Sequence, residues 1–394
     1  MEKIPTQIVI EGLAKIVVPD FSKYRRENGV YEPTWAPVFY NPLMKLNRDL
    51  SVAVIEAYSL RRKALKIADI LAGTGVRGIR FALEVNNIDK VHINDKNPLA
   101  YEFMVKNIEL NNVASKVEAE NLDANLMLRY HRFVGELFDY IDIDPFGSPI
   151  EFIDSALATV RINGMLGITA TDTAVLEGKH PSACIRKYFS KPVKTYFSKE
   201  LAIRILLASI VLRAASQEMG VNVKLGYYNK YYVRVYVTVS KGAKRADESL
   251  KNLGYVIFDR EKETFFTAHD LAKLYSFTDG KRYVISGPIW LGKLGEKEFI
   301  EDVYKIIIKK NHLKYKEITR LILMLKDELD YPPLYYNVDS LGKKLKISIP
   351  SMNNLFECLR KQGYRAIRVH CEPKGFKTNA PLETIIECFK KLSH

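Results

Sequence analysis

The sequence predicts an α/β fold with a doubly wound, mostly parallel sheet, followed by a smaller α+β domain. Two observations predict it. From residue 66 to residue 170, short apolar segments alternate with segments of helical period, which is the order of the strand–helix–strand units of a parallel sheet. Beyond residue 241 this order is lost, and a chain of 394 residues is long enough for two domains.

The elements of the sheet follow in order along the first part of the chain. Apolar runs predict strands at residues 66–72, 90–94, 116–119, 138–144 and 164–170. Helical periodicity predicts helices at residues 79–85, 97–111 and 149–160. Two more strands, at residues 221–227 and 232–239, lie too close together for a crossover helix. We therefore expect an antiparallel hairpin at one end of the sheet.

A basic segment at residues 241–245 marks the expected boundary between the two domains, residues 1–240 with an N-terminal extension and residues 241–394. In the second domain we expect helices at residues 247–253, 296–310, 316–329, 352–362 and 382–392, and strands at residues 255–259 and 366–371. The net charge is +14, and residues 241–394 hold 29 Lys and Arg against 20 Asp and Glu. This basic excess favours a polyanionic partner, although a merely soluble basic surface would have the same charge.

Several classes of protein are excluded or disfavoured. No apolar run reaches the roughly 18 residues of a membrane span, and the N-terminus lacks a signal-peptide pattern, so we expect a cytoplasmic protein without membrane contact. The cysteines, at positions 184, 358, 371 and 388, contain no closely spaced pair. Buried thiols are expected, and no metal site.

A glycine-rich turn, Gly73-Thr-Gly-Val-Arg-Gly, lies between the first strand and the first helix of the sheet. A P-loop is excluded because no Gly-Lys-Ser/Thr follows. Asp95 stands 22 residues after Gly73, where an acid would accept from the ribose hydroxyls of a dinucleotide or of S-adenosylmethionine (SAM). About 65 residues precede the strand that leads into the turn, more than is usual in a dinucleotide fold.

The end of the fourth strand favours SAM. Asp144-Pro-Phe-Gly resembles the Asp-Pro-Pro-Tyr type of motif in amino-group methyltransferases. The exocyclic amine of a base is a poor nucleophile, and a carboxylate that accepts its N–H localises the lone pair and can take the proton. Proline fixes the backbone carbonyl, and Phe146 would stack on an extruded base. The alternative is an acid that caps the next helix, followed by an ordinary core phenylalanine.

Further motifs along nearly the whole chain extend this resemblance. They are Pro37-Val-Phe-Tyr-Asn-Pro, Asn47-Arg-Asp, Gly75-Val-Arg-Gly-Ile-Arg, Asn94-Asp, Asp144-Pro-Phe-Gly-Ser-Pro, Thr169-Ala-Thr-Asp-Thr-Ala, His180-Pro, Cys184-Ile-Arg-Lys-Tyr, Gly287-Pro-Ile-Trp-Leu-Gly and Gly375-Phe-Lys-Thr-Asn-Ala-Pro. In this combination and order the chain resembles the tRNA (guanine-26-N2)-dimethyltransferases of archaea and eukaryotes. The resemblance implies a class I SAM-dependent methyltransferase domain, a C-terminal domain peculiar to these enzymes, tRNA as substrate and no obligatory protein partner.

The resemblance also implies site residues. SAM would be contacted at the Gly73 turn and by Arg48, Arg77, Asp95, Asp123 and Ala124. The arginines suit its carboxylate, Asp95 suits the ribose, and Asp123 with the Ala124 backbone suits the adenine edge. Asp144 would be the catalytic acceptor, and Phe39 and Phe146 would flank the guanine. Two alternatives stay open: Arg77 as a helix-surface charge and Phe39 as a core aromatic.

Two basic regions are expected to contact RNA. His180, Arg186 and Lys187 lie in a segment that also contains lysines 179, 191 and 194, although a solvated charged loop would look the same. The C-terminal candidates are Arg365, Arg368, Lys374 and Lys377. Asp172 could line the pocket or cap a turn. Residues 264–286 contain no cysteine, so the zinc site that some relatives have in this region is not expected.

Other functions remain as alternatives at this point. The same pocket chemistry would serve a methyltransferase of guanine in rRNA, or of adenine or cytosine in DNA. A non-catalytic RNA-binding relative would not need the intact Asp144 and cofactor residues. A dinucleotide oxidoreductase would leave the Asp-Pro-Phe-Gly segment and the basic C-terminus unexplained.

Overall fold

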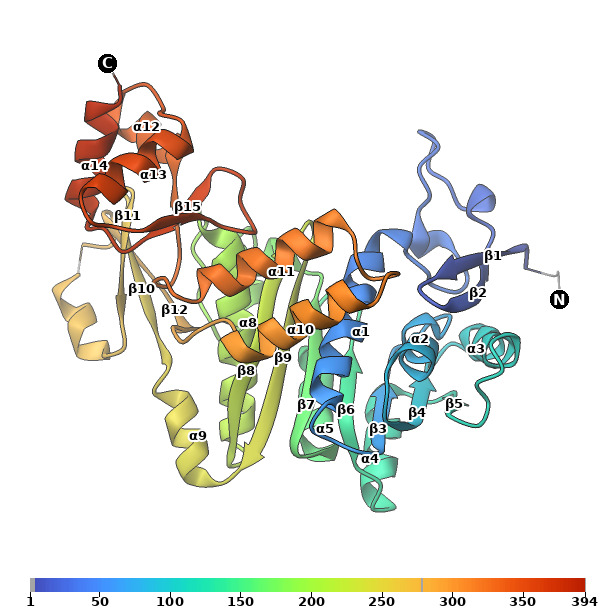
Figure 1. Ribbon diagram of the computed structural model, residues 1–394. Coiled ribbons are helices and arrows are strands. Elements are labelled where there is room, and N and C mark those ends of the chain that lie inside the picture. Colours follow the sequence, from blue (N-terminus) through green and yellow to red (C-terminus); the bar gives the residue numbers. More distant parts are fainter. Residues whose placement is uncertain (1–3, 278, 394) are drawn as a thin grey trace.

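A seven-stranded sheet forms the centre of the molecule in the computed structural model, which describes residues 4–277 and 279–393 (Figure 1). The strand order is β5-β4-β3-β6-β7-β9-β8. The parallel strands are β3 (Leu65–Asp69), β4 (Ile88–Asn94), β5 (Val117–Glu120), β6 (Phe138–Ile143) and β7 (Val160–Ala170). The hairpin of β8 (Met219–Asn229) and β9 (Tyr232–Lys241) completes the sheet, with β9 antiparallel to β7. The predicted parallel sheet and its antiparallel end hairpin are confirmed.

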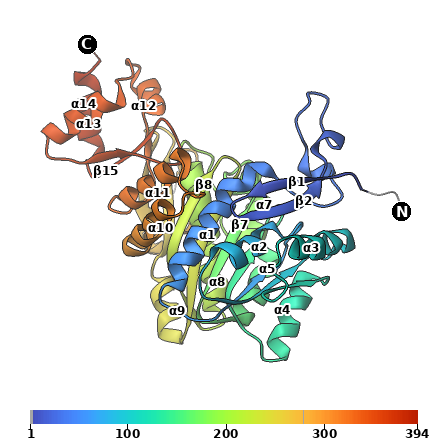
Figure 2. The same ribbon diagram turned by 45° about the vertical axis from the view of Figure 1, so that its right-hand side comes forward.

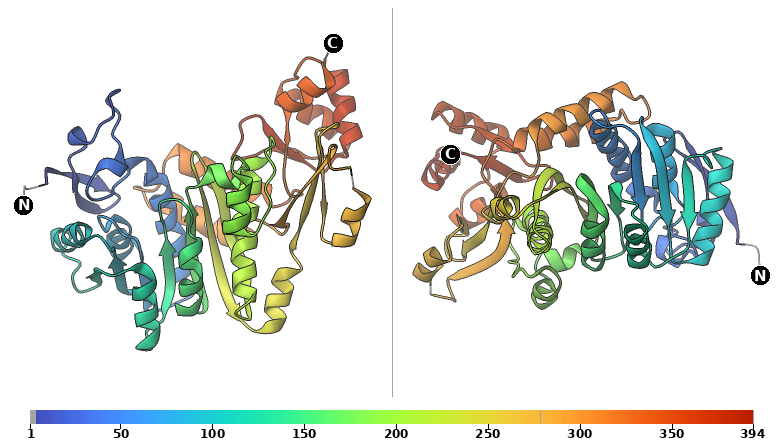
Figure 3. Two further views of the ribbon diagram at one scale, coloured as in Figure 1. Left: turned by 180° about the vertical axis from the view of Figure 1, so that it is seen from behind. Right: turned by 90° about the horizontal axis from the view of Figure 1, so that it is seen from below.

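Helices cover both faces of this sheet (Figure 3). One face carries α1 (Lys45–Ser59), α2 (Val76–Glu84), α3 (Pro98–Leu110), α10 (Lys297–Lys309) and α11 (Lys316–Glu328). The other carries α4 (Ala124–Phe133), α5 (Ile150–Thr159) and α8 (Ser198–Ala215). Side chains that alternate along each strand divide between the two layers, as Ile67 and Ala68 of β3 do. Among the described residues, no helix is long and apolar enough to cross a membrane.

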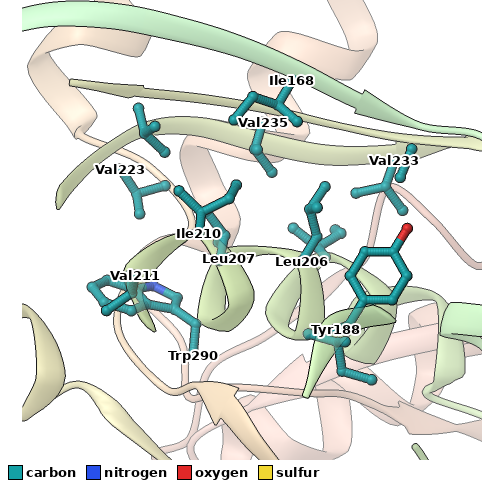
Figure 4. Close-up of a cluster of buried hydrophobic side chains, with 14 of the residues drawn as sticks. Ile168, Tyr188, Leu206, Leu207, Ile210, Val211, Val223, Val233, Val235 and Trp290 are labelled. Carbon is teal, nitrogen blue, oxygen red and sulfur yellow. The ribbon is translucent and has the colours of Figure 1, made fainter. Parts of the chain in front are cut away.

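Helix α8 is the centre of the layer on its side of the sheet. Leu206, Leu207 and Ile210 pack toward the valines of β9, and Trp290 approaches the same helix from a second sheet (Figure 4). That sheet is antiparallel and consists of β10 (Leu253–Asp259), β11 (Thr264–Ala268) and β12 (Tyr283–Trp290). Helix α8 was not predicted, because an almost fully buried helix has no polar face.

The N-terminal hairpin and the C-terminal unit lie on opposite sides of the central sheet (Figure 2). The hairpin of β1 (Thr6–Glu11) and β2 (Ala14–Pro19) stands near the N-terminus, and α6 (Thr173–Leu176), α7 (Pro181–Tyr188) and α9 (Ala243–Leu250) connect the larger elements. The C-terminal unit has its own core and contains α12 (Val338–Leu345), α13 (Met352–Lys361), α14 (Leu382–Lys391) and a small sheet of β13 (Tyr336–Asn337), β14 (Ala366–Arg368) and β15 (Gly375–Thr378).

Helix α10 packs on α1 and α11 packs on α10, in one core with the sheet, although the sequence of both helices lies in the expected C-terminal domain. Tyr315 donates from its hydroxyl to Asp49 Oδ2 at 2.9 Å, and His312 Nε2 lies 2.8 Å from Glu84 Oε2. The domain boundary at residue 240 stays a prediction, but the chain on its two sides shares a core. At the expected boundary, β9 ends at Lys241 and α9 begins at Ala243.

The cysteines divide into two kinds. Cys184 and Cys371 are free and buried, as expected. Cys358 and Cys388 form a disulfide between α13 and α14, so the expectation of four free thiols is wrong. The partners are separated by 30 residues in the sequence, and only the packing of the two helices in the C-terminal core brings them together.

Candidate active site

The glycine turn lies at the carboxyl edge of the sheet, between β3 and α2. Gly73 has a φ of +54°, and a Cβ built on it would lie 2.8 Å from the carbonyl oxygen of Phe39. Gly75 is left-handed as well, with a φ of +78°, and forms the N-cap of α2. Glycine is required at both positions because a side chain would strain the backbone or collide with residue 39. The helix accordingly begins at Val76, three residues before the predicted start.

Asp95 follows β4, the strand next to β3, and reaches the glycine turn. Its Oδ2 accepts from the backbone N–H of Gly73 at 2.9 Å, and its Oδ1 accepts from that of Asn97 at 2.9 Å. The side chain remains partly exposed. The predicted ribose ligand and the predicted cofactor turn therefore lie in direct contact at one edge of the sheet.

Asp123 and Ala124 begin α4 after β5, the next strand along the same edge. Asp123 Oδ1 accepts from the backbone N–H groups of Asn125 and Leu126 at 3.0 and 3.2 Å, which caps the helix. Asn94 connects this loop to β4. Its Nδ2 donates to the carbonyl of Leu122 at 3.0 Å, and its Oδ1 accepts from the backbone N–H of Leu122 at 3.0 Å. The loops that follow β3, β4 and β5 thus form one hydrogen-bonded edge.

Arg48 lies on α1, buried beside the N-terminal hairpin. Its Nε and Nη2 donate to the two carboxylate oxygens of Glu11 at 2.6 and 2.5 Å, and Nη2 also donates to the carbonyl of Asn41 at 3.1 Å. Burial alone would raise the pKa of Glu11, but Arg48 and then Arg80 outweigh it and lower the pKa to about 2. The sequence analysis missed Glu11, whose partner stands 37 residues away. The contact of Arg48 with SAM stays a prediction.

Arg77 on α2 touches the predicted catalytic acid. Its Nη2 donates to Asp144 Oδ2, and its Nη1 donates to Asn47 Oδ1 at 2.9 Å and to Ser51 Oγ at 2.7 Å. Burial opposes the charge, but Asp142 and Asp144 raise the pKa of Arg77 above its ordinary value. The alternative of a helix-surface charge for Arg77 is wrong, because the residue is 4% exposed.

A buried ionic network that the sequence analysis missed supports this contact from β6 and β9. Arg234 Nη2 donates to Asp142 Oδ2 at 2.5 Å and to the Tyr140 hydroxyl at 3.0 Å. Burial would raise the pKa of Asp142, but Arg234 and Arg77 hold it below its usual value. Burial, with the neighbouring charge of Asp142, raises the pKa of Asp69 to about 7. In the sequence, Asp142 gave a sign of this network, as a second acid two residues before Asp144.

Two phenylalanines meet near this edge, Phe146 two residues after Asp144 and Phe39 beside the Gly73 turn. The rings of Phe39 and Phe146 touch edge to face, with centroids 4.3 Å apart and planes at 82°. Phe146 is 63% exposed, whereas Phe39 is partly buried. A base stacked between two rings needs a separation of roughly 7 Å, twice the spacing of stacked bases. If a guanine is to lie between them as predicted, one ring has to swing away.

The predicted RNA-binding segment is helix α7, with His180 directly before it. His180, Arg186 and Lys187 are all exposed. Asp172 makes no capping hydrogen bond with its side chain, and its place in the lining of the pocket stays a prediction. Its Oδ1 instead accepts from the Tyr188 hydroxyl at 2.6 Å, and Lys187 Nζ lies 3.4 Å from its Oδ2, so Asp172 anchors α7.

The four C-terminal candidates do not share one environment. Arg365, Arg368 and Lys374 are exposed on the C-terminal unit. Lys377 is only 3% exposed, and its Nζ donates to Glu200 at 3.0 Å. The prediction that Lys377 contacts RNA is wrong, because β15 turns this side chain inward toward α8.

Comparison with known proteins identifies the family. Residues 12–390 match the family model described as N2,N2-dimethylguanosine tRNA methyltransferase. The chain belongs to this family. It is 39% identical over 399 residues to a tRNA (guanine(26)-N(2))-dimethyltransferase of Pyrococcus furiosus, covering 97% of this chain and 98% of that protein. The protein of the same description in Methanobrevibacter smithii is 38% identical over 402 residues, covering 100% and 99%.

A solved structure agrees with this membership. The complex of Trm1 from Pyrococcus horikoshii with S-adenosyl-L-methionine superposes with a TM-score of 0.85 at 36% identity, covering 97% of this chain and 99% of that one. The resemblance stated from the motifs and the fold class it implied, a class I methyltransferase with an added C-terminal part, are confirmed.

One consequence for the cofactor edge is testable on Asp95. We expect Asp95→Ala to weaken SAM binding by about 1.5–3 kcal/mol, since it removes charge-assisted hydrogen bonds and releases the Gly73 turn. Isothermal calorimetry measures this loss. Asp89→Ala, an exposed substitution near the other end of β4, serves as the control. Equal SAM affinity in the two variants would contradict the role of Asp95.

Proposed function

We propose that this protein transfers one or two methyl groups from SAM to the exocyclic N2 of guanine 26 in tRNA. The printed activity of the relatives supports it. The observation that carries it is the position of Asp144, which follows β6 directly beside β3 and its glycine turn. An acceptor for the amine of a base and a turn suited to the cofactor therefore share one edge of the sheet.

The residues at this edge fit SAM by their chemistry. Asp95 offers a carboxylate for the ribose hydroxyls, and the left-handed Gly73 and Gly75 allow the backbone to turn sharply at the edge where the cofactor is expected. Asp123 and the Ala124 backbone lie on the neighbouring loop, where the adenine is expected. When bound, SAM supplies a methyl group on a positively charged sulfur, which is a strong electrophile.

The protein's own groups activate the amine. Asp144 accepts a hydrogen bond from the N2 amino group, localises its lone pair and takes the proton that the methylated nitrogen loses. Arg77 holds one carboxylate oxygen of Asp144 and is itself held by Asn47 and Ser51, so the acceptor is oriented before the base arrives. Phe146 is exposed beside it and offers a face for stacking on an extruded base.

The assignment can be tested directly by nucleoside mass spectrometry. The protein is incubated with isotopically labelled SAM and a tRNA transcript, and the digested nucleosides are analysed. We expect labelled N2-methylguanosine or N2,N2-dimethylguanosine, and no label in a matched transcript with adenine at position 26. Equal labelling of both transcripts would assign another guanine, and label only in rRNA or DNA would assign one of the alternative substrates.

We also propose that the exposed basic residues of the C-terminal unit grip the tRNA body. Replacing Arg365, Arg368 and Lys374 together with Ala should weaken tRNA binding and lower its salt slope by about 3, since each phosphate contact contributes about 0.9. Filter binding over a series of salt concentrations measures both quantities, and SAM affinity should not change.

The matched control removes three exposed cations at the opposite edge of the sheet, next to the amino ends of β3 and β5: Arg61, Lys63 and Lys116. Its salt slope should stay at the wild-type value. If the two triple variants bind tRNA alike, the basic C-terminus does not contact the RNA, and α7 becomes the docking candidate.

A further inference from the structure

Three side chains with metal-binding atoms meet between the sheet and α4, away from Asp144. They are His92 on β4, Glu120 at the end of β5 and His131 on α4 (Figure 1 shows these elements). Glu120 Oε1 lies 2.9 Å from His92 Nδ1 and 2.9 Å from His131 Nε2. One ligand atom from each residue lies within 4.8 Å of the other two. Two imidazoles and a carboxylate from three different elements thus meet at one point.

This cluster is largely removed from water. His92 is 4% exposed and His131 is 5% exposed, and both rings pack edge to face on Phe138 at centroid distances of 5.4 and 5.1 Å. The Glu120 side chain keeps 15% exposure, which leaves a route from solvent. Burying polar groups against an aromatic ring is unfavourable unless each of them finds a partner.

The hydrogen bonds within the cluster do not satisfy every ring nitrogen of the two histidines. His131 faces carboxylates with both nitrogens, Glu120 through Nε2 and Glu136 through Nδ1 at 3.0 Å. His92 uses Nδ1 toward Glu120, and its buried Nε2 has no hydrogen-bond partner among the residues that the structure describes. Three ring nitrogens thus lie at hydrogen-bond distance from the two carboxylates. The fourth, His92 Nε2, lies 3.9 Å from Glu136 Oε1, too far for a hydrogen bond.

A cation at the meeting point would take His92 Nδ1, His131 Nε2 and a Glu120 oxygen as its ligands. His131 would coordinate through Nε2 and donate its Nδ1–H to Glu136, the carboxylate–histidine–metal arrangement that fixes a ligating imidazole. Lys66 Nζ donates to the same Glu136 at 2.5 Å and holds it in place. Ligand atoms around a tetrahedral zinc ion lie about 3.3 Å apart. Binding would therefore open the two 2.9 Å separations slightly and bring the two imidazole nitrogens, which lie within 4.8 Å of each other, to the same spacing.

We propose that His92, Glu120 and His131 bind one divalent transition-metal ion of the zinc class. Two nitrogens and one oxygen suit Zn²⁺, whereas Mg²⁺ and Ca²⁺ prefer oxygen ligands. The expectation of no metal site was based on the cysteines, and this site uses none. The ion would link β4, β5 and α4 to one another. Asp95 follows β4, Asp123 follows β5, and Ala124 is the first residue of α4. The ion therefore braces the edge where the cofactor is expected, and this second statement rests on the proposed function.

The test begins with the full-length protein after chelator treatment and dialysis against zinc chloride. We expect mass spectrometry of metals to find one more equivalent of tightly held zinc in the wild type than in the His92→Gln/His131→Gln double variant. Zinc should raise the Tm of the wild type by several degrees and leave that of the double variant unchanged. His269→Gln, which replaces an exposed histidine outside the cluster, should retain the wild-type zinc content.

Two results would overturn the site: a wild type that holds no tight zinc, or a folded double variant that holds as much as the wild type. If circular dichroism shows that the double variant is unfolded, Glu120→Gln replaces it in the same comparison. Bracing of the cofactor edge has its own readout, a several-fold tighter SAM affinity in the zinc-loaded protein than in the chelated one. Equal SAM affinities would refute the bracing and leave the metal site standing.

Discussion

Asp144→Asn should abolish nearly all methyl transfer and leave SAM binding close to normal. The substitution keeps the size of the side chain but removes the carboxylate that accepts the amine proton, and removal of a general base typically costs about 10²–10⁴-fold in rate. Arg77 keeps its bonds to Asn47 and Ser51, so the cofactor edge stays folded. Single-turnover transfer to tRNA, followed by nucleoside mass spectrometry, measures the loss.

The matched control is Asp154→Asn, an exposed carboxylate on α5 that pairs with Arg213. It should transfer methyl groups at the wild-type rate. A rate for Asp144→Asn within a few-fold of this control would mean that the proton leaves by another route, and the role of Asp144 would reduce to orienting Arg77.

Lys377→Met should destabilise the fold by about 3 kcal/mol without changing the salt slope of tRNA binding. The ammonium lies between Glu200 and Glu328, which are both buried, so its removal leaves two carboxylates with less compensation. Arg204 still pairs with Glu200, and His370 still pairs with Glu328. The expected loss of stability is therefore at the low end of the range for breaking a buried ion pair. Urea unfolding measures the change, and Lys374→Met, an exposed neighbour, should shift it by less than about 0.5 kcal/mol.

The same network sets a pH dependence. Burial alone would raise the pKa of Glu200, but Lys377 and Arg204 lower it from 4.5 to about 2. A depressed carboxyl pKa stabilises the fold fully above pH 4.5, and this contribution is lost as the pH falls toward 2. The difference between wild type and Lys377→Met should therefore shrink on acidification from pH 5 to pH 3. A constant difference would show that the ion pairs do not carry the effect.

Much of the sheet could be predicted because its signals are local. A buried parallel strand is a short apolar run, and the glycine turn with Asp95 and Asp144 gives fixed points along the chain. Helices α1 and α8 could not be found in this way, since nearly every residue in them is buried and no polar face alternates with an apolar one. Their charged residues, such as Arg48 and Glu200, interrupt the pattern because their partners lie far away in the sequence.

The same difference between local and long-range signals applies to the candidate site. The motifs placed Gly73, Asp95 and Asp144 on one edge, but they did not reveal that Arg77 touches Asp144 or that Arg234 supports it from β9. These contacts form only when strands and helices that are far apart in the sequence come together in the fold. Lys377 was assigned to RNA because net charge counts cations without their environment. Its carboxylate partner Glu200 lies 177 residues earlier in the chain.

The packing of α10 on α1 has a consequence for synthesis on the ribosome. The sheet is complete in sequence when β9 ends at Lys241, but the outer face of α1 is covered only after α10 ends at Lys309. At roughly 5–20 residues per second, the emerging chain exposes this apolar face for roughly 3–14 s. During that interval the nascent chain is exposed to aggregation, and binding by a chaperone at α1 would protect it until α10 arrives.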